Sequence, residues 1–384
     1  MRGAPGRQAP ITGEVKRAPS SLHLASTPMI ALACAAAARA HSGRARLLLL
    51  GDFEHAGRLA ALLRAWRDNP FEVIECLPGR FDEHARGAPD RARGVAQFFR
   101  RIAIKRALRR ETLALIAVHD AELEPARVWV GNDRKVETQY ALHLATARTA
   151  GTPGEYLDDG LYTYLGDVRQ RPATRLFDAI VKRLTYGRWW QRGRHVGTTS
   201  WIARVWLAFP HAAPPIYARD RVRQLPQAWF LGRAWLRMVV LSARESGLAR
   251  RELADCSEVW VLPHSNLLRA SPGLLDALRI RLRAAADRGQ RIAIKYHPRD
   301  VGSDPFGLAA EGGPLVLPAL LPMELLLPLL PRGAVVEGEA STALLAARWL
   351  RPDLKVSNFG AATHPYARAA QQLLAQLDAA PPSA

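Results

Sequence analysis

The feature that most constrains this chain is a twofold alternation of short apolar runs with amphipathic helical patterns. The first series spans residues 22–160 and includes the apolar run ARLLLLGDF at 45–53. The second spans residues 257–377 and includes RIAIKYHP at 291–298. Fully apolar strands separated by helices are typical of parallel sheets with helices on both faces. The sequence therefore predicts an α/β protein with two Rossmann-like domains facing across a cleft, where ligands bind at the carboxyl ends of the strands.

Changes in composition divide the 384 residues into five segments. The first 20 residues are rich in Gly, Pro and Arg and contain no apolar stretch, so they predict a flexible basic leader. The predicted segments are 1–20 (leader), 21–165 (first Rossmann-like domain), 166–252 (basic, Trp-rich helical connecting region), 253–360 (second Rossmann-like domain) and 361–384 (C-terminal helix and tail).

The charge of the chain points to an anionic partner. Lys and Arg number 54 against 35 Asp and Glu, a net charge of +19, although part of the excess reflects an Arg-rich composition throughout. Residues 161–252 concentrate it, with 17 basic and five acidic residues and six of the ten tryptophans. One interpretation is an inserted helical layer with a Trp core. The other is a basic-aromatic surface for an anionic glycan or anionic lipid, with contacts from Arg188, Arg192 and Arg194.

Several protein classes are disfavoured by what the sequence lacks. The three cysteines lie far apart without a CxxC, which indicates neither a disulfide framework nor a zinc site and fits a reducing compartment. The apolar run 22–38 is interrupted by Ser26-Thr27-Pro28, whereas a membrane span needs roughly 20 apolar residues. It also starts too late for a secretory signal. We expect a cytoplasmic protein, with peripheral contact with the inner face of the cytoplasmic membrane as an addition.

Common ligand and catalytic motifs are also missing. The sequence contains no P-loop, no GxGxxG, no HExxH and no GxSxG. Acidic pairs that could hold a metal on a diphosphate are sparse. We therefore expect no metal and no cofactor, and we expect no nucleic-acid partner because no recognised reading motif is present.

Three short features stand at predicted strand ends. Asp158-Asp159-Gly160 closes the first series, and its two carboxylates can divide labour, one facing the cleft and the other held by backbone amides. His297-Pro298 follows an apolar strand, and Ser341-Thr342 opens a helix whose free amides suit an anion. Taken singly, each also fits an ordinary structural role, namely a turn, a polar strand end or a helix N-cap. Together they put a base on one wall and an anion cradle on the other, which suits group transfer with a phosphate leaving group.

The order of these features resembles that of bacterial sialyltransferases, above all the capsule polysialyltransferase and lipooligosaccharide sialyltransferase branches. Those families share a D/E-D/E-G motif, an HP motif and a paired Ser/Thr motif on a GT-B fold. The resemblance covers about residues 22–160 and 255–350, and the middle region matches nothing that can be aligned. Residue by residue, it falls on Asp158-Asp159-Gly160, His297-Pro298, Ser341-Thr342, Glu324 in LPMELLLP, and Ser26-Thr27 in LASTPMIAL.

The resemblance implies an inverting, metal-independent glycosyltransferase that uses CMP-sialic acid and a cell-surface glycan acceptor, either capsular polysaccharide or lipooligosaccharide. The first domain would be the acceptor side and the second the nucleotide-sugar side. Asp158 would take the proton of the acceptor hydroxyl, with Asp159 as the alternative base. His297 would assist the departing phosphate. Donor binding would fall to the remaining matched residues, namely Asp159, Gly160, Pro298, Glu324, Ser341, Thr342, Ser26 and Thr27.

Two other functions fit the same residues. One is a GT-B glycosyltransferase with a different nucleotide sugar, such as CMP-Kdo. The other is a capsule-assembly protein that binds a nucleotide without catalysis. The acceptor, the linkage and the number of residues added have no signal in the sequence.

Overall fold

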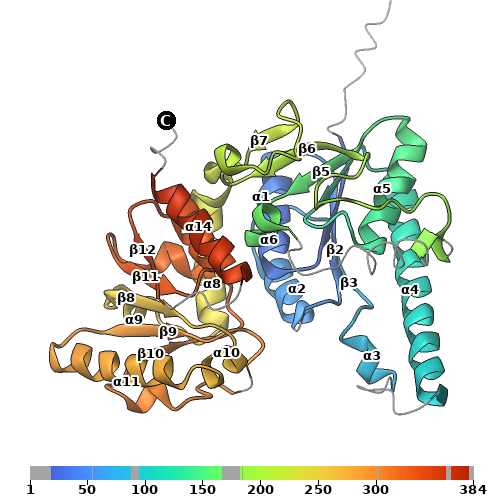
Figure 1. Ribbon diagram of the computed structural model, residues 1–384. Helices are drawn as coiled ribbons and strands as arrows, with labels where there is room; N and C mark the ends of the chain where they lie inside the picture. The colour runs from blue at the N-terminus through green and yellow to red at the C-terminus, as the bar shows by residue number, and fades with distance from the viewer. Residues whose placement is uncertain are drawn as a thin grey trace, which may run out of the picture.

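The computed structural model describes residues 19–379 apart from 54, 88–94, 167–181, 184, 301 and 360–364. Within that part of the chain, two parallel sheets form two α/β bodies that face each other (Figure 1). The first sheet has seven strands in the order β3-β2-β1-β4-β5-β6-β7. Its strands are β1 (Ser21–Ala25), β2 (Ala45–Leu50), β3 (Val73–Leu77), β4 (Arg127–Val130), β5 (Gly154–Leu157), β6 (Ile202–Leu207) and β7 (Val222–Gln224).

The helices of the first body connect these parallel strands. Pro at the first turn and the side chain of Thr27 as N-cap fix the start of the first helix, whose apolar residues are almost entirely buried. The helices are α1 (Pro28–Ala40), α2 (Ala56–Ala65), α3 (Asp82–Ala85), α4 (Val95–Leu123), α5 (Val136–Thr149) and α6 (Leu161–Leu165), with the 3-10 turns η1 (Pro210–Ala212) and η2 (Gln227–Phe230).

The second sheet has five parallel strands in the order β10-β9-β8-β11-β12, so both sheets share the Rossmann pattern of strand neighbours. Its strands are β8 (Glu258–Val261), β9 (Ile292–Lys295), β10 (Leu315–Leu317), β11 (Val335–Gly338) and β12 (Lys355–Asn358). The surrounding helices are α8 (Arg233–Glu245), α9 (Arg250–Ala254), α10 (Ser265–Arg269), α11 (Pro272–Asp287), α12 (Met323–Leu326), α13 (Thr342–Leu350) and α14 (Pro365–Ala379), with the 3-10 turns η3 (Leu308–Ala310) and η4 (Leu327–Leu329).

The predicted α/β architecture of two Rossmann-like domains is confirmed, but the connecting region differs from its prediction. Within the predicted helical segment 166–252, β6 and β7 are strands that extend the first sheet beyond β5. Glu155 of β5 pairs with Arg204 of β6 and also accepts a hydrogen bond from the Trp206 indole. Part of the positive charge of this edge is therefore balanced within the sheet. The described part of this segment therefore belongs largely to the first body, and only α8 leads away from it.

The tryptophans of residues 161–252 pack inside the protein. Trp190, Trp201 and Trp235 are buried, and Trp189, Trp206 and Trp229 are half-buried. Trp206 and Trp229 lie 5.3 Å apart between ring centroids, and both also contact the buried Trp129 of β4. The prediction that these tryptophans form a basic-aromatic surface is therefore wrong. Their rings pack in the core, as the alternative interpretation of a layer with a Trp core required.

Two helices tie the bodies together. The buried face of α8 packs on α2 of the first body and on α12 of the second, and the Trp66 indole donates to the Ala234 carbonyl. The C-terminal helix α14 returns to pack on α6 and η1 of the first body (Figure 1). Among the described residues, no helix combines the length and apolar character that crossing a membrane requires.

Candidate functional site

The site lies where the carboxyl ends of β5 and β11 meet. Asp158 follows β5 and is buried, with 1% of its surface exposed. Its Oδ1 accepts from the Gly160 amide at 2.9 Å, and its Oδ2 accepts from the Tyr164 hydroxyl at 2.5 Å and the Ala208 amide at 2.9 Å. Burial raises the pKa of Asp158, and these donors oppose that rise. This carboxylate is held in place and organises the turn.

Asp159 is the carboxyl group with chemical freedom. Its side chain is half-buried, and its Oδ1 accepts one long hydrogen bond, 3.4 Å, from the Thr27 hydroxyl. Burial and then the neighbouring charge of Asp158 raise the pKa of Asp159 to about 7. A carboxyl group with a pKa near neutrality is suited to accept a proton. Asp158, the predicted base, is held by backbone amides, and Asp159, the predicted alternative, is not, so the proposal below gives the role of base to Asp159.

Residues that follow the carboxyl ends of neighbouring strands of the first sheet surround the Asp159 carboxyl group. Ser26 is buried at the end of β1, and Thr27 both caps α1 and contacts Asp159. Lys135, which follows β4, lowers the pKa of Asp159 and donates to the Asp52 carboxylate after β2 at 2.5 Å. The Lys135–Asp52 pair has no motif in the sequence, and only the shared carboxyl edge of the sheet brings it to the site.

Gly160 lets the two bodies touch. Its φ is +71°, a conformation that glycine adopts without strain. A Cβ placed there would overlap the side chain of Thr342, and the Thr342 hydroxyl accepts from the Leu161 amide at 3.2 Å. The first and third sequence motifs, which lie 181 residues apart, are therefore in direct contact across the domain boundary.

Ser341 stands at the N-cap of α13 with extended backbone angles, but its hydroxyl makes no capping bond. The Oγ atom is buried without a hydrogen-bond partner among the described residues. Buried hydroxyls are normally paired, and leaving one unpaired costs free energy. The side chain of this serine therefore does not act as an N-cap, and its hydroxyl is left as an unused donor.

His297 and Pro298 follow β9, as the sequence predicted. His297 is half-buried, and its Nδ1 accepts from the Arg299 amide at 3.2 Å, which leaves Nε2 as the protonated nitrogen of the neutral ring. Burial and then the neighbouring His264 lower the pKa of His297. Pro298 is exposed at the turn. His264 follows β8 in the same way and was missed, because one His after an apolar strand is a weak signal.

Glu324 lies in the first turn of α12 and is buried, with 6% of its surface exposed. Burial raises its pKa, and the opposite charge of Lys295 at the end of β9 opposes that rise. Lys295 is buried too, and its ammonium donates to the carbonyls of Pro318 and Ala319. Burial lowers the pKa of Lys295 to about 8. Glu324 and Lys295 form a second buried polar cluster, in the second body, of which only Glu324 was predicted.

Arg188, Arg192 and Arg194 are exposed on the loop before β6. The loop is anchored at the carboxyl edge of the first sheet: Asp133 accepts from the Gly197 and Thr199 amides, at 2.6 and 2.9 Å. The three guanidinium groups therefore stand on a loop that is anchored to the first body.

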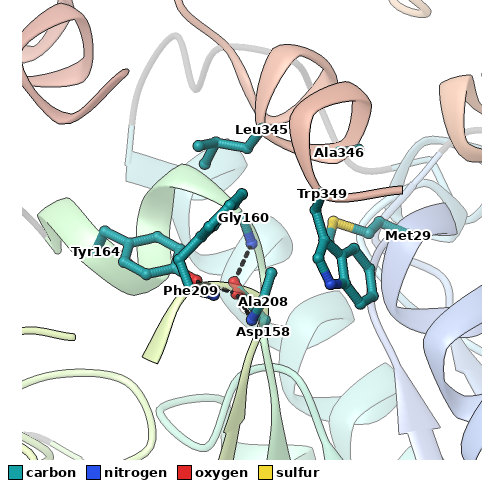
Figure 2. Close-up of a pocket in the computed structure, with 9 residues that line it drawn as sticks. All are labelled: Met29, Asp158, Gly160, Tyr164, Ala208, Phe209, Leu345, Ala346 and Trp349. Atoms are coloured by element: carbon teal, nitrogen blue, oxygen red, sulfur yellow. Dashed lines mark hydrogen bonds between the residues drawn. The ribbon is translucent and has the colours of Figure 1, made fainter. Parts of the chain in front are cut away.

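A small pocket opens beside Asp158, between the two bodies (Figure 2). Its walls are mostly apolar, and the Asp158 carboxylate points at the Gly160 and Ala208 amides at its base. The lining residues are Met29, Asp158, Gly160, Tyr164, Ala208, Phe209, Leu345, Ala346 and Trp349. Among the described residues, no group of three or more His, Cys, Asp or Glu side chains is placed to hold a metal ion.

Sequence comparison identifies no relative, since no family model matches the chain and no curated protein matches it. Solved structures do share its fold. An α/β-galactoside α-2,3-sialyltransferase from Photobacterium phosphoreum has a TM-score of 0.55 at 11% identity, over 96% of this chain and 97% of that one. A UDP-GlcNAc 2-epimerase from Methanocaldococcus jannaschii has a TM-score of 0.50 at 9% identity, over 94% and 91%.

These likenesses define the fold class. Two Rossmann-like domains joined in this way form the GT-B fold, which confirms the predicted fold. Because a transferase and an epimerase share it at such low identity, the fold alone does not select a reaction. The choice rests on the residues of the site.

Proposed function

We propose that this protein is an inverting, metal-independent glycosyltransferase that moves sialic acid from CMP-sialic acid to a cell-surface glycan. The observation that carries the proposal is the contact of Gly160-Leu161 with Thr342, which joins a carboxyl group suited to proton transfer to a hydroxyl-bearing helix start. That arrangement suits a reaction in which a hydroxyl attacks on one side while a phosphate leaves on the other.

The chemistry follows from the positions of the side chains. The acceptor hydroxyl oxygen forms a bond to the anomeric carbon while its proton passes to the Asp159 carboxylate. The bond between that carbon and the phosphate oxygen breaks, and its electron pair leaves with CMP. His297 Nε2 and the Ser341 and Thr342 hydroxyls donate hydrogen bonds to the developing phosphate charge, and Glu324 binds the ribose. Attack opposite to the leaving group inverts the configuration.

The acceptor side is assigned on charge. The exposed Arg188, Arg192 and Arg194 extend from a loop fixed on the sheet that carries Asp159, so the first body offers three cations to an anionic glycan. Burial of the tryptophans removes the aromatic anchors that membrane contact would use, so we assign these arginines to the glycan. Peripheral contact with the inner face of the membrane is tested separately, by sedimentation of the protein with anionic vesicles.

The donor is tested by calorimetric titration of the protein with CMP, UMP, UDP and GDP. Tightest binding of CMP supports the proposal. Transfer is then assayed with CMP-sialic acid, CMP-Kdo and UDP-GlcNAc, each with sialylated and neutral oligosaccharides, and NMR reports the anomeric configuration of the product. Transfer only from CMP-Kdo or UDP-GlcNAc would replace the donor. Conversion of UDP-GlcNAc to its 2-epimer would reject transfer, and CMP binding without turnover would favour the non-catalytic alternative.

A further inference from the structure

Three polar residues, His297, His264 and Ser341, follow the carboxyl ends of three neighbouring strands of the second sheet. Lys295 of β9 pairs with Val261 of β8, and Val261 pairs with Gly338 of β11. Beyond this row, the chain continues for two residues to His297, for three to His264, and for three to Ser341. Because β8 lies between β9 and β11, His264 is flanked by the histidine and the serine that the proposed function assigns to the leaving phosphate.

The two imidazoles form a matched pair. Their ring centroids lie 5.1 Å apart, with an interplanar angle of 64°. The Nδ1 atom of His264 accepts from the Asn266 amide at 3.1 Å, as the Nδ1 atom of His297 accepts from the Arg299 amide at 3.2 Å. In both neutral rings the proton therefore sits on Nε2. The two backbone contacts give the edge two imidazole N–H donors of the same tautomer.

A buried carboxylate supports the pair. The Asp300 side chain is fully buried, and its Oδ1 accepts from the Ser265 amide at 3.0 Å. The same Oδ1 lies 3.9 Å from His264 Nε2, which is too long for a hydrogen bond. The Asp300 Oδ2 atom is buried with no partner among the described residues. Asp300 therefore holds the backbone directly after His264 and lies beside its ring.

We infer that His264 is a second imidazole donor to the departing phosphate, acting beside His297, and that Asp300 positions it. The inference rests on the proposed function, since it assigns the ligand of that same site. When the bond from the anomeric carbon to the phosphate oxygen breaks, the oxygen takes the electron pair, and the Nε2–H groups of both histidines face the added charge. The phosphate then meets two ring donors together with the unpartnered Ser341 hydroxyl.

The competing role for His264 is purely structural, since its ring also caps α10 through Nδ1. Two substitutions separate the roles. His264→Asn keeps a short acceptor for the Asn266 amide and removes the Nε2 donor. His264→Gln carries an amide N–H to the place of Nε2 and lacks a good capping atom. The full-length protein and both variants are titrated with CMP and with cytidine, so that the difference reports the phosphate alone.

We expect His264→Asn to weaken CMP binding roughly 10- to 100-fold, the range for a hydrogen bond to a charged group, and to leave cytidine binding and thermal unfolding unchanged. His264→Gln should retain most of the CMP affinity. The inference would be overturned if His264→Asn bound CMP as tightly as the wild type while His264→Gln lost stability. His264 would then serve only as the N-cap of α10. Asp300→Asn should lower CMP affinity in the wild type and have a smaller effect in the His264→Asn background.

This inference and the proposed function fail in different ways. If the wild type prefers UMP to CMP or transfers another sugar, the sialic acid donor is wrong, and the same comparison is made with UMP and uridine. If CMP binds and transfer occurs but His264→Asn behaves as wild type, only the role of His264 is wrong. Absence of binding of any nucleotide to the wild type would reject both.

Discussion

The carboxyl edges of the two sheets differ in how their polar groups are satisfied. On the first sheet, Asp158 accepts three hydrogen bonds from its own chain and is fully enclosed. On the second, the Ser341 hydroxyl and the Asp300 Oδ2 atom are buried without partners among the described residues. A folded chain leaves few such groups unpaired. At the first edge, one carboxyl group is enclosed and its neighbour Asp159 keeps a single long hydrogen bond. At the second edge, the Ser341 hydroxyl is left as a donor that a ligand with acceptor oxygens would satisfy under the proposed function.

The largest effect should come from Asp159, the less constrained carboxyl group of the first edge. Asp159→Asn should lower the rate of transfer by ~10² to 10⁴, the usual contribution of a general base, and leave CMP affinity within about twofold of the wild type. Initial rates with saturating CMP-sialic acid measure the first quantity and calorimetry the second. Retention of more than about a tenth of the wild-type rate would remove Asp159 from the proton transfer.

The pH dependence sharpens this assignment. With the pKa of Asp159 near 7, the rate should fall as the pH drops below 7, because the protonated group cannot accept a proton. The same pKa lies above the ordinary value of 3.8, so the folded state retains a proton that the unfolded state releases. Stability should therefore fall as the pH rises from about 4 to 7. Asp159→Asn should unfold at a higher temperature than the wild type at neutral pH, and the difference should vanish near pH 4.

The enclosed carboxylate should show a different pattern. Asp158→Asn brings an amide NH₂ group toward the Tyr164, Ala208 and Gly160 donors, so the free energy of unfolding should fall by about 1 to 3 kcal/mol. Urea denaturation followed by tryptophan fluorescence measures this loss. If Asp158→Asn were fully stable and inactive while Asp159→Asn remained active, the roles of the two carboxyl groups would be exchanged.

A smaller effect is expected at the carboxyl edge of the second sheet. Ser341→Ala should weaken CMP binding about tenfold, and it should change the free energy of unfolding by less than about 0.5 kcal/mol, because the hydroxyl makes no bond in the unliganded protein. A serine that caps its helix would instead lose ~1 kcal/mol on substitution. Measuring both quantities on one variant decides between a phosphate ligand and a cap.

The smallest effect should come from the exposed loop. Replacing Arg188, Arg192 and Arg194 with Gln should raise KM for an anionic glycan a few-fold at low salt, with stability unchanged because the side chains are exposed. The difference should shrink as salt shortens the Debye length from ~10 Å toward 3 Å. Sedimentation with anionic vesicles tests membrane contact in parallel. The control variant removes three exposed arginines from the second body, namely Arg250, Arg288 and Arg332.

An equal effect of the control variant would mean that total charge, not this loop, governs the acceptor. Loss of vesicle binding together with unchanged glycan kinetics would move these arginines from the glycan to the membrane.

The sequence by itself determined the two sheets and the places where chemistry could occur. Apolar runs with period-specific helices between them are local signals, and the residues that end those strands necessarily meet at one edge of a parallel sheet. For that reason the order of residues alone assigns the motifs around Asp158, His297 and Ser341 to their edges. It does not reveal the strand β6, because Arg204 has the character of a surface cation until Glu155 of the neighbouring strand is seen beside it.

Only the tertiary structure decided which member of each motif is free to react. Asp158 and Asp159 are adjacent and chemically identical. They differ because the nearby Tyr164 hydroxyl and the Ala208 amide, 50 residues along the chain, enclose one of them. His264 gains meaning only from the strand order that puts β8 between β9 and β11. Burial and hydrogen bonding set the pKa and the availability of a side chain, and both depend on residues far away in the chain.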